Sequence, residues 1–364
     1  MTRRDFPGGT LVCKTSNCAP QNCLQVSATN RAHPPLDDPL PIPLLPPPPP
    51  YEDGPLPQNH SAIYVHVGKT GGITLDNVLY SNCMWYYGRA RRQQCLRALL
   101  AGKPSQISEI TKATLHFGPR SDYLEWVDRA SLFLITLRNP IARVVSAYHF
   151  DHPSNQILNR RGTSMSEDVR HFYIVCFPTI QDMADLLELA SQGTKKLSKK
   201  QRRCFDTARR TLVGQGSTLA ASHLRMNYNY YHGLSTAQYP DRPVLVLRTE
   251  QLWEDLSRVD RMLGGAGVFE NAGIVYTHGS QSHVVHTDLS SRGKEVVCCY
   301  LASEMQLYEE LLRRAINLFP VEMDATMGAV YRECGWGREG FEKEFSSWSA
   351  WARIKCPMST ESST

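Results

Sequence analysis

The chain has 364 residues with 41% hydrophobic content, which suffices for one large α/β domain and additional segments. A formal net charge of +5 suits anionic ligands but is too weak to indicate nucleic-acid binding. Eleven cysteines form no C-x-x-C pair and show no metal-ligand spacing, so they favour scattered disulfides in a secretory lumen or buried free thiols over a metal site.

Residues 1–60 have the composition of a stem. Twelve of the 23 prolines lie between Pro34 and Pro57, and the unbroken run Pro46–Pro50 predicts a stiff polyproline II spacer, so most of this segment is expected to be disordered. A glycosylation sequon begins at Asn59. No apolar run approaches the 18 residues of a membrane anchor.

Residues 62–80 combine a strand, a glycine-rich turn and a helix. Strand-like sequence over 62–67 leads into Gly68-Lys69-Thr70-Gly71-Gly72, and apolar residues at helical spacing follow. Because the first amides of a helix have no partner inside it, such a turn predicts an anion site, to which Lys69 adds positive charge. The spacing is not that of a Walker A loop, because Ile63 stands where the first glycine would be needed.

A second strand and helix are predicted over residues 132–150. Leu132–Leu137 is an apolar run of strand length, Asn139 is a good N-cap, and Pro140 suits the first helical position. Arg138 therefore stands where a strand ends and a helix begins, which is the usual ligand edge of an open α/β sheet. Ser146 follows two helical turns later and is placed to share one phosphate with Arg138.

Together these two stretches resemble sulfotransferases that use 3′-phosphoadenosine 5′-phosphosulfate (PAPS), in particular Golgi enzymes such as the heparan sulfate 2-O and 6-O sulfotransferases. Lys69-Thr70-Gly71-Gly72-Ile73-Thr74 is similar to the K-T-G-G-T-T signature, with Ile in place of one Thr. Arg138–Tyr148 matches R-[DN]-P-x-x-R-x-x-S-x-[YW] completely. The resemblance covers roughly residues 60–320 and implies a P-loop-like central parallel sheet flanked by helices.

The resemblance also implies roles for individual residues. Lys69 would neutralise the leaving phosphate oxygen, and Arg138 and Ser146 would hold the 3′-phosphate. The 5′-phosphate would be held by Thr70, Gly71, Gly72 and Thr74. The family has a catalytic histidine between its two motifs, and here His116 lies on a strand predicted over residues 113–117. No metal is needed. Other candidate bases are Glu109, Asp122, His149 and His152.

A basic cluster between residues 195 and 210 stands out in a chain of this net charge. The cluster predicts a surface that binds an anionic carbohydrate. A solvated surface loop would carry the same charges without binding a ligand. The residues assigned to this partner surface are Lys195, Lys196, Lys199, Lys200, Arg202 and Arg203. The tyrosine-rich segment 220–233 reads as a helix near the cleft, and 244–248 as a strand followed by a helix.

The sequence thus predicts a disordered stem (1–60), a sulfotransferase domain (61–325) and a C-terminal tail (326–364) in which Cys334 is placed to lie near Cys356. The predicted activity is transfer of a sulfuryl group from PAPS to a carbohydrate hydroxyl, in the Golgi or secretory lumen, with a membrane anchor expected from the resemblance but not visible. One alternative is a nucleotide-dependent kinase or NTPase, which the Walker A spacing and Arg138 oppose. Another is a non-catalytic glycan-binding protein on the same scaffold.

Overall fold

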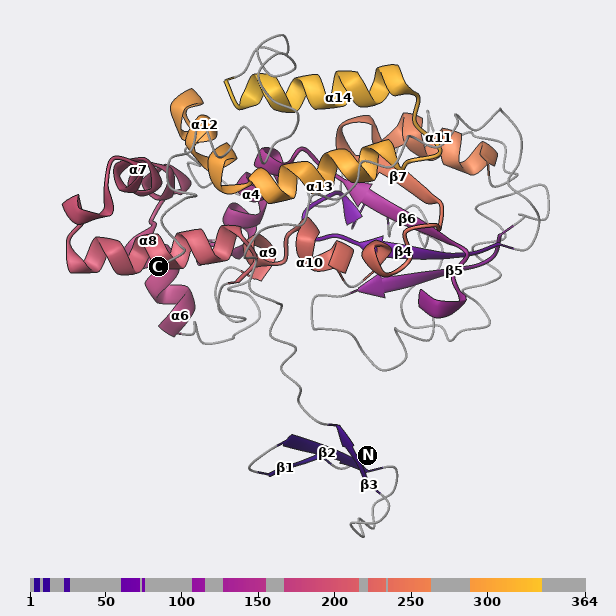
Figure 1. Ribbon diagram of the computed structural model, residues 1–364, viewed down its shortest axis with the longest axis horizontal. Coiled ribbons are helices and arrows are strands. Elements are labelled where there is room, and N and C mark those ends of the chain that lie inside the picture. Colours follow the sequence, from indigo (N-terminus) through magenta and orange to yellow (C-terminus); the bar gives the residue numbers. More distant parts are fainter. Residues whose placement is uncertain are drawn as a thin grey trace. The chain divides into compact units, whose positions relative to one another are not determined.

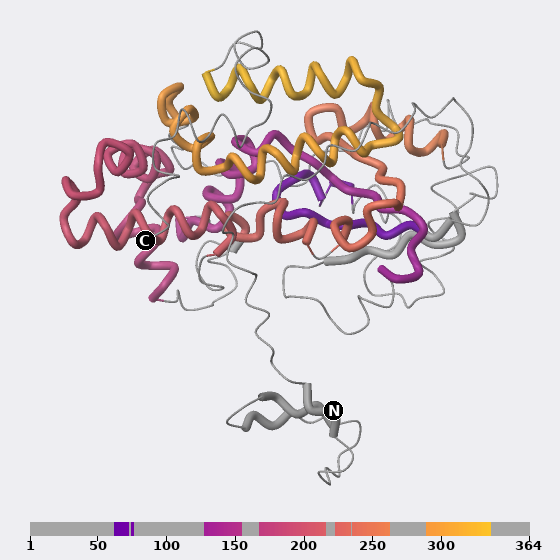
Figure 2. The backbone as a smooth tube through the Cα atoms, in the orientation of Figure 1, coloured from indigo at the N-terminus to yellow at the C-terminus, as the bar shows by residue number. Residues whose placement is uncertain are grey.

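The structure, a computed structural model, describes residues 3–6, 9–13, 23–26, 60–72, 74–75, 107–114, 127–154, 167–215, 222–233, 235–262 and 289–335. The chain divides into two units, residues 1–46 and 47–364 (Figure 1). The first unit contains a three-stranded antiparallel sheet of β1 (Arg3–Phe6), β2 (Gly9–Cys13) and β3 (Cys23–Val26). Most of the predicted stem lies outside the described residues. Figure 2 colours the residues of uncertain placement grey, and residues 1–59 are among them.

A parallel sheet forms the centre of the second unit. Its strands are β4 (His60–His66), β5 (Ile107–Thr114), β6 (Leu132–Leu137) and β7 (Val244–Arg248), in the spatial order β5-β4-β6-β7. Every neighbouring pair is parallel. The predicted α/β class with a central parallel sheet is therefore confirmed.

Helices cover both faces of this sheet. Alternate residues of a strand point to opposite faces, and they contribute here to two separate apolar clusters. Ile63, Phe133 and Val246 belong to the larger cluster, whereas Tyr64, Leu134 and Leu247 belong to the smaller one, with α11 (Leu252–Met262). The helices of the larger cluster include α4 (Pro140–Asp151), α7 (Ile180–Ser191), α8 (Lys199–Leu212), α10 (Tyr228–Gly233), α12 (Ser291–Tyr300), α13 (Ala302–Arg313) and α14 (Pro320–Glu333).

Short helical segments complete the described part of the second unit. They are α6 (Glu167–Arg170), α9 (Ser222–Arg225), the π-helix η2 (His171–Cys176) and the 3₁₀ turns η3 (Thr194–Lys196), η4 (Thr236–Gln238) and η5 (Thr249–Gln251). In the described residues, no helix has the length and apolar character needed to cross a membrane.

Several elements differ from the sequence-based expectation. The strand predicted over residues 113–117 overlaps β5, which begins earlier, at Ile107; residues 115–117, with His116, lie outside the described residues. The helix predicted over 220–233 is divided into α9 and α10, because the Asn227 side chain accepts the backbone N–H of Tyr230 and begins a new helix.

The C-terminal region also differs from the domain boundary that the sequence predicts. Helix α14 continues through residue 325, the predicted end of the domain. Cys334 forms a disulfide with Cys298 and so joins the end of α14 to α12. Cys356 lies outside the described residues. A second disulfide, Cys176–Cys204, joins η2 to α8.

Candidate functional site

The candidate site lies where the strand order of the parallel sheet reverses. The chain passes from β4 to β5 on one side, whereas β6 and β7 follow on the other side of β4. In open α/β sheets, ligands bind beyond the carboxyl ends of the strands at such a switch point. Here the carboxyl ends of β4 and β6 lead to Lys69 and Arg138, respectively. The two predicted motifs therefore meet at one edge.

The turn after β4 has a special backbone conformation. Lys69 has φ of +67° and Gly71 has φ of +79°, both in the left-handed region. Lysine rarely adopts that conformation, and strain of this kind is concentrated at functional sites. The N–H of Leu75 donates to the carbonyl of Gly71 at 3.0 Å, which closes the first helical turn. A Cβ atom on Gly72 would lie 2.5–2.9 Å from the His66 ring, so a side chain at this position would force that ring to move.

Thr70 is fully buried beneath the turn. Its hydroxyl lies 2.9 Å from the carbonyl oxygen of Val67, to which it donates, and 2.6 Å from the hydroxyl of Thr136 on β6. These bonds fasten the turn to the neighbouring strand. The side chain of Thr70 is thus used within the protein, which leaves its backbone N–H as the group for an anion.

Lys69 is a partly buried cation. Burial lowers the pKa of its amine to about 8; the Asp151 carboxylate opposes this shift and the Arg138 guanidinium adds to it. The amine lies 3.8 Å from the centre of the Phe150 ring. Among the described residues, no carboxylate oxygen lies within 4.0 Å of this amine. Within the described part of the chain, the amine is therefore not neutralised by a salt bridge.

Arg138 lies beside Lys69. Its Nη1 donates to the Lys69 carbonyl oxygen at 3.3 Å, and none of the ion pairs in the described part of the chain includes it. Two adjacent cations without carboxylate partners are typical of an anion site.

Helix α4 begins as predicted. The Asn139 side chain accepts the backbone N–H groups of Ile141 and Ala142, and Pro140 occupies the first turn. The Asn139 N–H donates to Glu250 Oε1 at 2.9 Å. Ser146 lies half-buried on this helix, about 10 Å along the axis from Asn139 at 1.5 Å per residue.

Arg143 is a charged residue in the interior of the protein. It is fully buried and forms a two-pronged ion pair with Glu304 of α13, at 2.6 and 3.0 Å. Its Nη1 also donates to the carbonyl oxygen of His223 at 2.9 Å. The second arginine of the matched motif is thus a structural group of the core.

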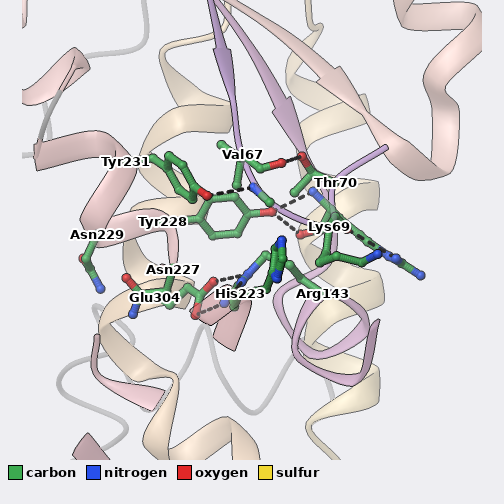
Figure 3. A network of polar contacts seen from close by, with 12 residues as sticks. Val67, Lys69, Thr70, Arg143, His223, Asn227, Tyr228, Asn229, Tyr231 and Glu304 are labelled. Carbon is green, nitrogen blue, oxygen red and sulfur yellow. Dashed lines mark hydrogen bonds and ion pairs between the residues drawn. The ribbon is translucent and has the colours of Figure 1, made fainter. Parts of the chain in front are cut away.

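Two tyrosines of α10 lie beside the turn after β4 and point their hydroxyls toward it, as Figure 3 shows. The Tyr228 hydroxyl accepts the Arg138 N–H at 2.7 Å and donates to the Arg138 carbonyl at 2.6 Å. The Tyr231 hydroxyl accepts the Gly68 N–H at 3.1 Å. Burial raises the pKa of both hydroxyls, so they remain protonated at neutral pH. The sequence predicted that this segment lies near the cleft, but the spacing of its tyrosines did not indicate that they bond to Gly68 and Arg138.

The histidines and acids named as bases are distributed as follows. His116 and Asp122 lie outside the described residues, and Glu109 lies within β5. His149 is half-buried near the end of α4, and His152 follows it, with Nδ1 2.6 Å from the Ser154 hydroxyl. The structure adds His223 on α9, whose Nδ1 lies 2.6 Å from Asp151 Oδ1.

The basic cluster is exposed on η3 and α8. All six predicted partner residues are exposed: Lys195, Lys196, Lys199, Lys200, Arg202 and Arg203. Three of them line a groove of about 760 Å³, together with Glu167, Asp168 and His171. The groove therefore has mixed charge, whereas η3 and the outer side of α8 are predominantly positive.

One cluster in the described residues has the composition of a metal site. The ligand atoms of His171, Cys176 and Cys204 lie within 4.8 Å of one another. The two sulfur atoms are joined in a disulfide, however, and metals are bound by free thiolates. As it stands, this cluster is a disulfide with a neighbouring imidazole.

Comparison with known proteins gave no match: no family model, no curated protein and no solved structure is significantly similar to the chain.

Proposed function

We propose that the protein is a sulfotransferase that moves a sulfuryl group from PAPS to a carbohydrate hydroxyl by in-line displacement. The observation that carries the proposal is the meeting of the two motifs at the switch point, where Arg138 Nη1 lies 3.3 Å from the Lys69 carbonyl oxygen. Both side chains are cations without a carboxylate partner among the described residues. We further propose that the parallel sheet is the P-loop-like sheet of the sulfotransferase fold.

The donor groups at this edge suit a ligand with two phosphates. Lys69 and the turn amides serve one phosphate, and Arg138 offers a fork of N–H groups for another. Because Gly72 has no side chain, the backbone of the turn can lie close to the end of β4. Because the anion would enter a partly dry site, it would be held more strongly than at an exposed lysine.

Each predicted phosphate-binding residue has a place in this proposal. The backbone of Thr70, Gly71 and Gly72, with Thr74, would hold the 5′-phosphate. Arg138 and Ser146 would hold the 3′-phosphate, and Lys69 would neutralise the charge that develops on the leaving oxygen. PAPS supplies the activated sulfuryl group, and a histidine must take the proton of the acceptor hydroxyl, a role that the resemblance gives to His116.

The acceptor is proposed to be an anionic carbohydrate held by η3 and α8. In Figure 1, α8 lies beyond the carboxyl ends of the strands, beside α9. Its exposed cations are thus on the same side of the sheet as Lys69 and Arg138. Ion pairs with sulfate or carboxylate groups would orient the chain without contributing to the chemistry.

The proposed compartment is the Golgi or secretory lumen. Disulfides persist in oxidising compartments and are rare in the cytosol, and the described residues contain two of them. Membrane anchoring is an expectation from the resemblance alone.

The cofactor class is tested by calorimetry. The parent protein should bind 3′-phosphoadenosine 5′-phosphate more tightly than ATP with magnesium, and Lys69→Ala should weaken that binding. Arg313→Ala is a matched control, because it removes one positive charge from the surface of α13, where Arg313 pairs with Glu309. Tighter binding of ATP would favour the kinase. Bisphosphate binding without transfer to any acceptor from labelled PAPS would favour the glycan-binding protein.

The acceptor surface is tested by neutralising Lys195, Lys196, Lys199 and Lys200 together. The KM for an anionic acceptor should rise at least tenfold while the affinity for the bisphosphate stays the same, because the four lysines are exposed on η3 and α8. An unchanged KM would remove this surface from the acceptor site.

A further inference from the structure

A buried network holds one histidine beside the candidate site. His223 on α9 is fixed at three points by side chains of α4. Its Nδ1 lies 2.6 Å from Asp151 Oδ1, its backbone N–H donates to Asp151 Oδ2 at 2.8 Å, and its carbonyl accepts Arg143 Nη1 at 2.9 Å. Arg143 is itself held by Glu304. Such reinforcement is typical of groups whose orientation matters for chemistry.

The contact with Asp151 determines the tautomer of His223. An ionised carboxylate can only accept hydrogen bonds, so the proton of the neutral ring lies on Nδ1. The lone pair is then on Nε2, which is the arrangement a histidine needs to act as a general base. The His223 side chain is 17% exposed, which leaves the ring partly accessible to solvent.

His223 and Lys69 contact the same aromatic ring. The Lys69 amine lies 3.8 Å from the centre of the Phe150 ring, and the centre of the His223 ring lies 4.8 Å from it. Figure 3 shows both residues within one polar network. In an in-line displacement, the attacking and leaving oxygens lie on opposite sides of the sulfur, so the base and the cation that stabilises the leaving oxygen stand on either side of the transferred group.

The charged and titratable groups around His223 come from several elements. Asp151 and Arg143 contact it from α4, Glu304 approaches through Arg143 from α13, and Lys69 lies across Phe150. The Asp151 carboxylate also acts electrostatically on the Lys69 amine, and it helps to raise the already elevated pKa of Tyr173 and Tyr231. Asp151 therefore acts on both His223 and Lys69.

We infer that His223 is the general base of this site and that Asp151 is its positioning residue. The inference rests on the proposed sulfuryl transfer. As the acceptor oxygen bonds to sulfur, its proton passes to His223 Nε2; the sulfur–oxygen bond to the phosphate breaks, and the phosphate leaves with the electron pair. The imidazolium then loses its proton to solvent. His223 thus takes the role that the resemblance gives to His116.

Four variants test the inference by transfer rate: His223→Ala, His223→Gln, Asp151→Asn and His116→Ala. The two His223 variants should lose 10²–10⁴-fold in kcat while binding of 3′-phosphoadenosine 5′-phosphate changes less than about twofold. Added imidazole should restore part of the rate of His223→Ala, which a purely structural loss would not allow. His232→Gln on α10 is the matched control, because His232 is also mostly buried but bonds to Thr236.

A measurement that needs no activity completes the test. Nitrogen NMR of the histidine-labelled parent should show His223 protonated at Nδ1 near neutral pH. Protonation at Nε2 would overturn the inference, as would a kcat of His223→Gln within threefold of the parent. Failure of the proposed function would appear differently, as absence of bisphosphate binding or transfer in the parent itself, and the inference would then fall with it.

Discussion

Lys69 combines a strained backbone with a dehydrated amine, and both features cost stability. The left-handed backbone of a non-glycine residue costs about 1–2 kcal/mol. Because folding lowers the pKa of the amine from 10.5 to about 8, the unfolded chain holds this proton more tightly. The amine therefore disfavours folding below about pH 8, and that penalty disappears above pH 10.5.

Replacing Lys69 by glycine should separate stability from binding. Lys69→Gly relieves the backbone strain and removes the buried charge, so the free energy of unfolding should rise by about 1 kcal/mol at pH 7. The gain should be smaller at pH 10, where the parent lysine is largely neutral. Bisphosphate binding should be lost at the same time. Denaturant titration and calorimetry measure the two effects, and a destabilised variant would contradict the strain argument.

Bisphosphate affinity should depend on the protonation of Lys69. A bound phosphate favours the charged amine, so binding above pH 8 requires proton uptake. The affinity should fall by up to about tenfold per pH unit above pH 8, and the calorimetric enthalpy should vary with the ionisation enthalpy of the buffer. Lys69→Met should bind weakly with no such slope, whereas Arg313→Ala should keep it. A flat profile in the parent would exclude Lys69 from the phosphate site.

Helix α10 supports the site through two hydroxyl groups, and removing them should have graded effects. Tyr228→Phe leaves two backbone groups of Arg138 unpaired and should cost about 2–4 kcal/mol of stability. Tyr231→Phe removes the acceptor of the Gly68 N–H and should cost about 1–2 kcal/mol. Tyr300→Phe is the control, because its hydroxyl makes only a 3.4 Å contact with Leu187. Equal losses in all three variants would show that these hydroxyl bonds do not anchor the edge.

The ion pair between α4 and α13 should behave as a unit. Arg143→Met leaves the Glu304 carboxylate buried and uncompensated, at a cost of about 3–5 kcal/mol. The double variant with Glu304→Leu should recover most of that loss, which thermal unfolding measures. Additive losses would show that the two charges are stabilised independently of each other.

Sequence patterns predicted the elements whose cause is local. The apolar run 132–137 and the capping pair Asn139-Pro140 determine β6 and the start of α4 without help from distant residues. The edge shared by Lys69 and Arg138 followed from the rule for parallel strands. The burial of Arg143 could not be predicted, because its partner Glu304 is 161 positions away. The hydroxyl contacts of α10 and the pairing of His223 with Asp151 could not be predicted either, because these partners are also distant in the sequence.

At the scale of the whole molecule, the disulfides connect helices that the sheet does not. Cys298–Cys334 closes a loop of 36 residues between α12 and α14, and its removal should cost up to about 4 kcal/mol. Replacing both cysteines by serine should lower the unfolding midpoint and leave bisphosphate binding intact, because the bond is not part of the site. Loss of binding in a folded variant would show that α14 supports the sheet edge directly.

The contacts of Gly68 and Arg143 also have a consequence for the order of folding. Tyr231 is 163 residues from Gly68 in the sequence, and Glu304 is 161 residues from Arg143. During synthesis, the turn and the start of α4 emerge long before the groups that fix them. Contacts between such distant residues form slowly, because closing large loops precedes any energetic gain. A nascent chain ending before α13 would carry Arg143 without its counter-charge, so this edge reaches its final form only after most of the chain has been synthesised.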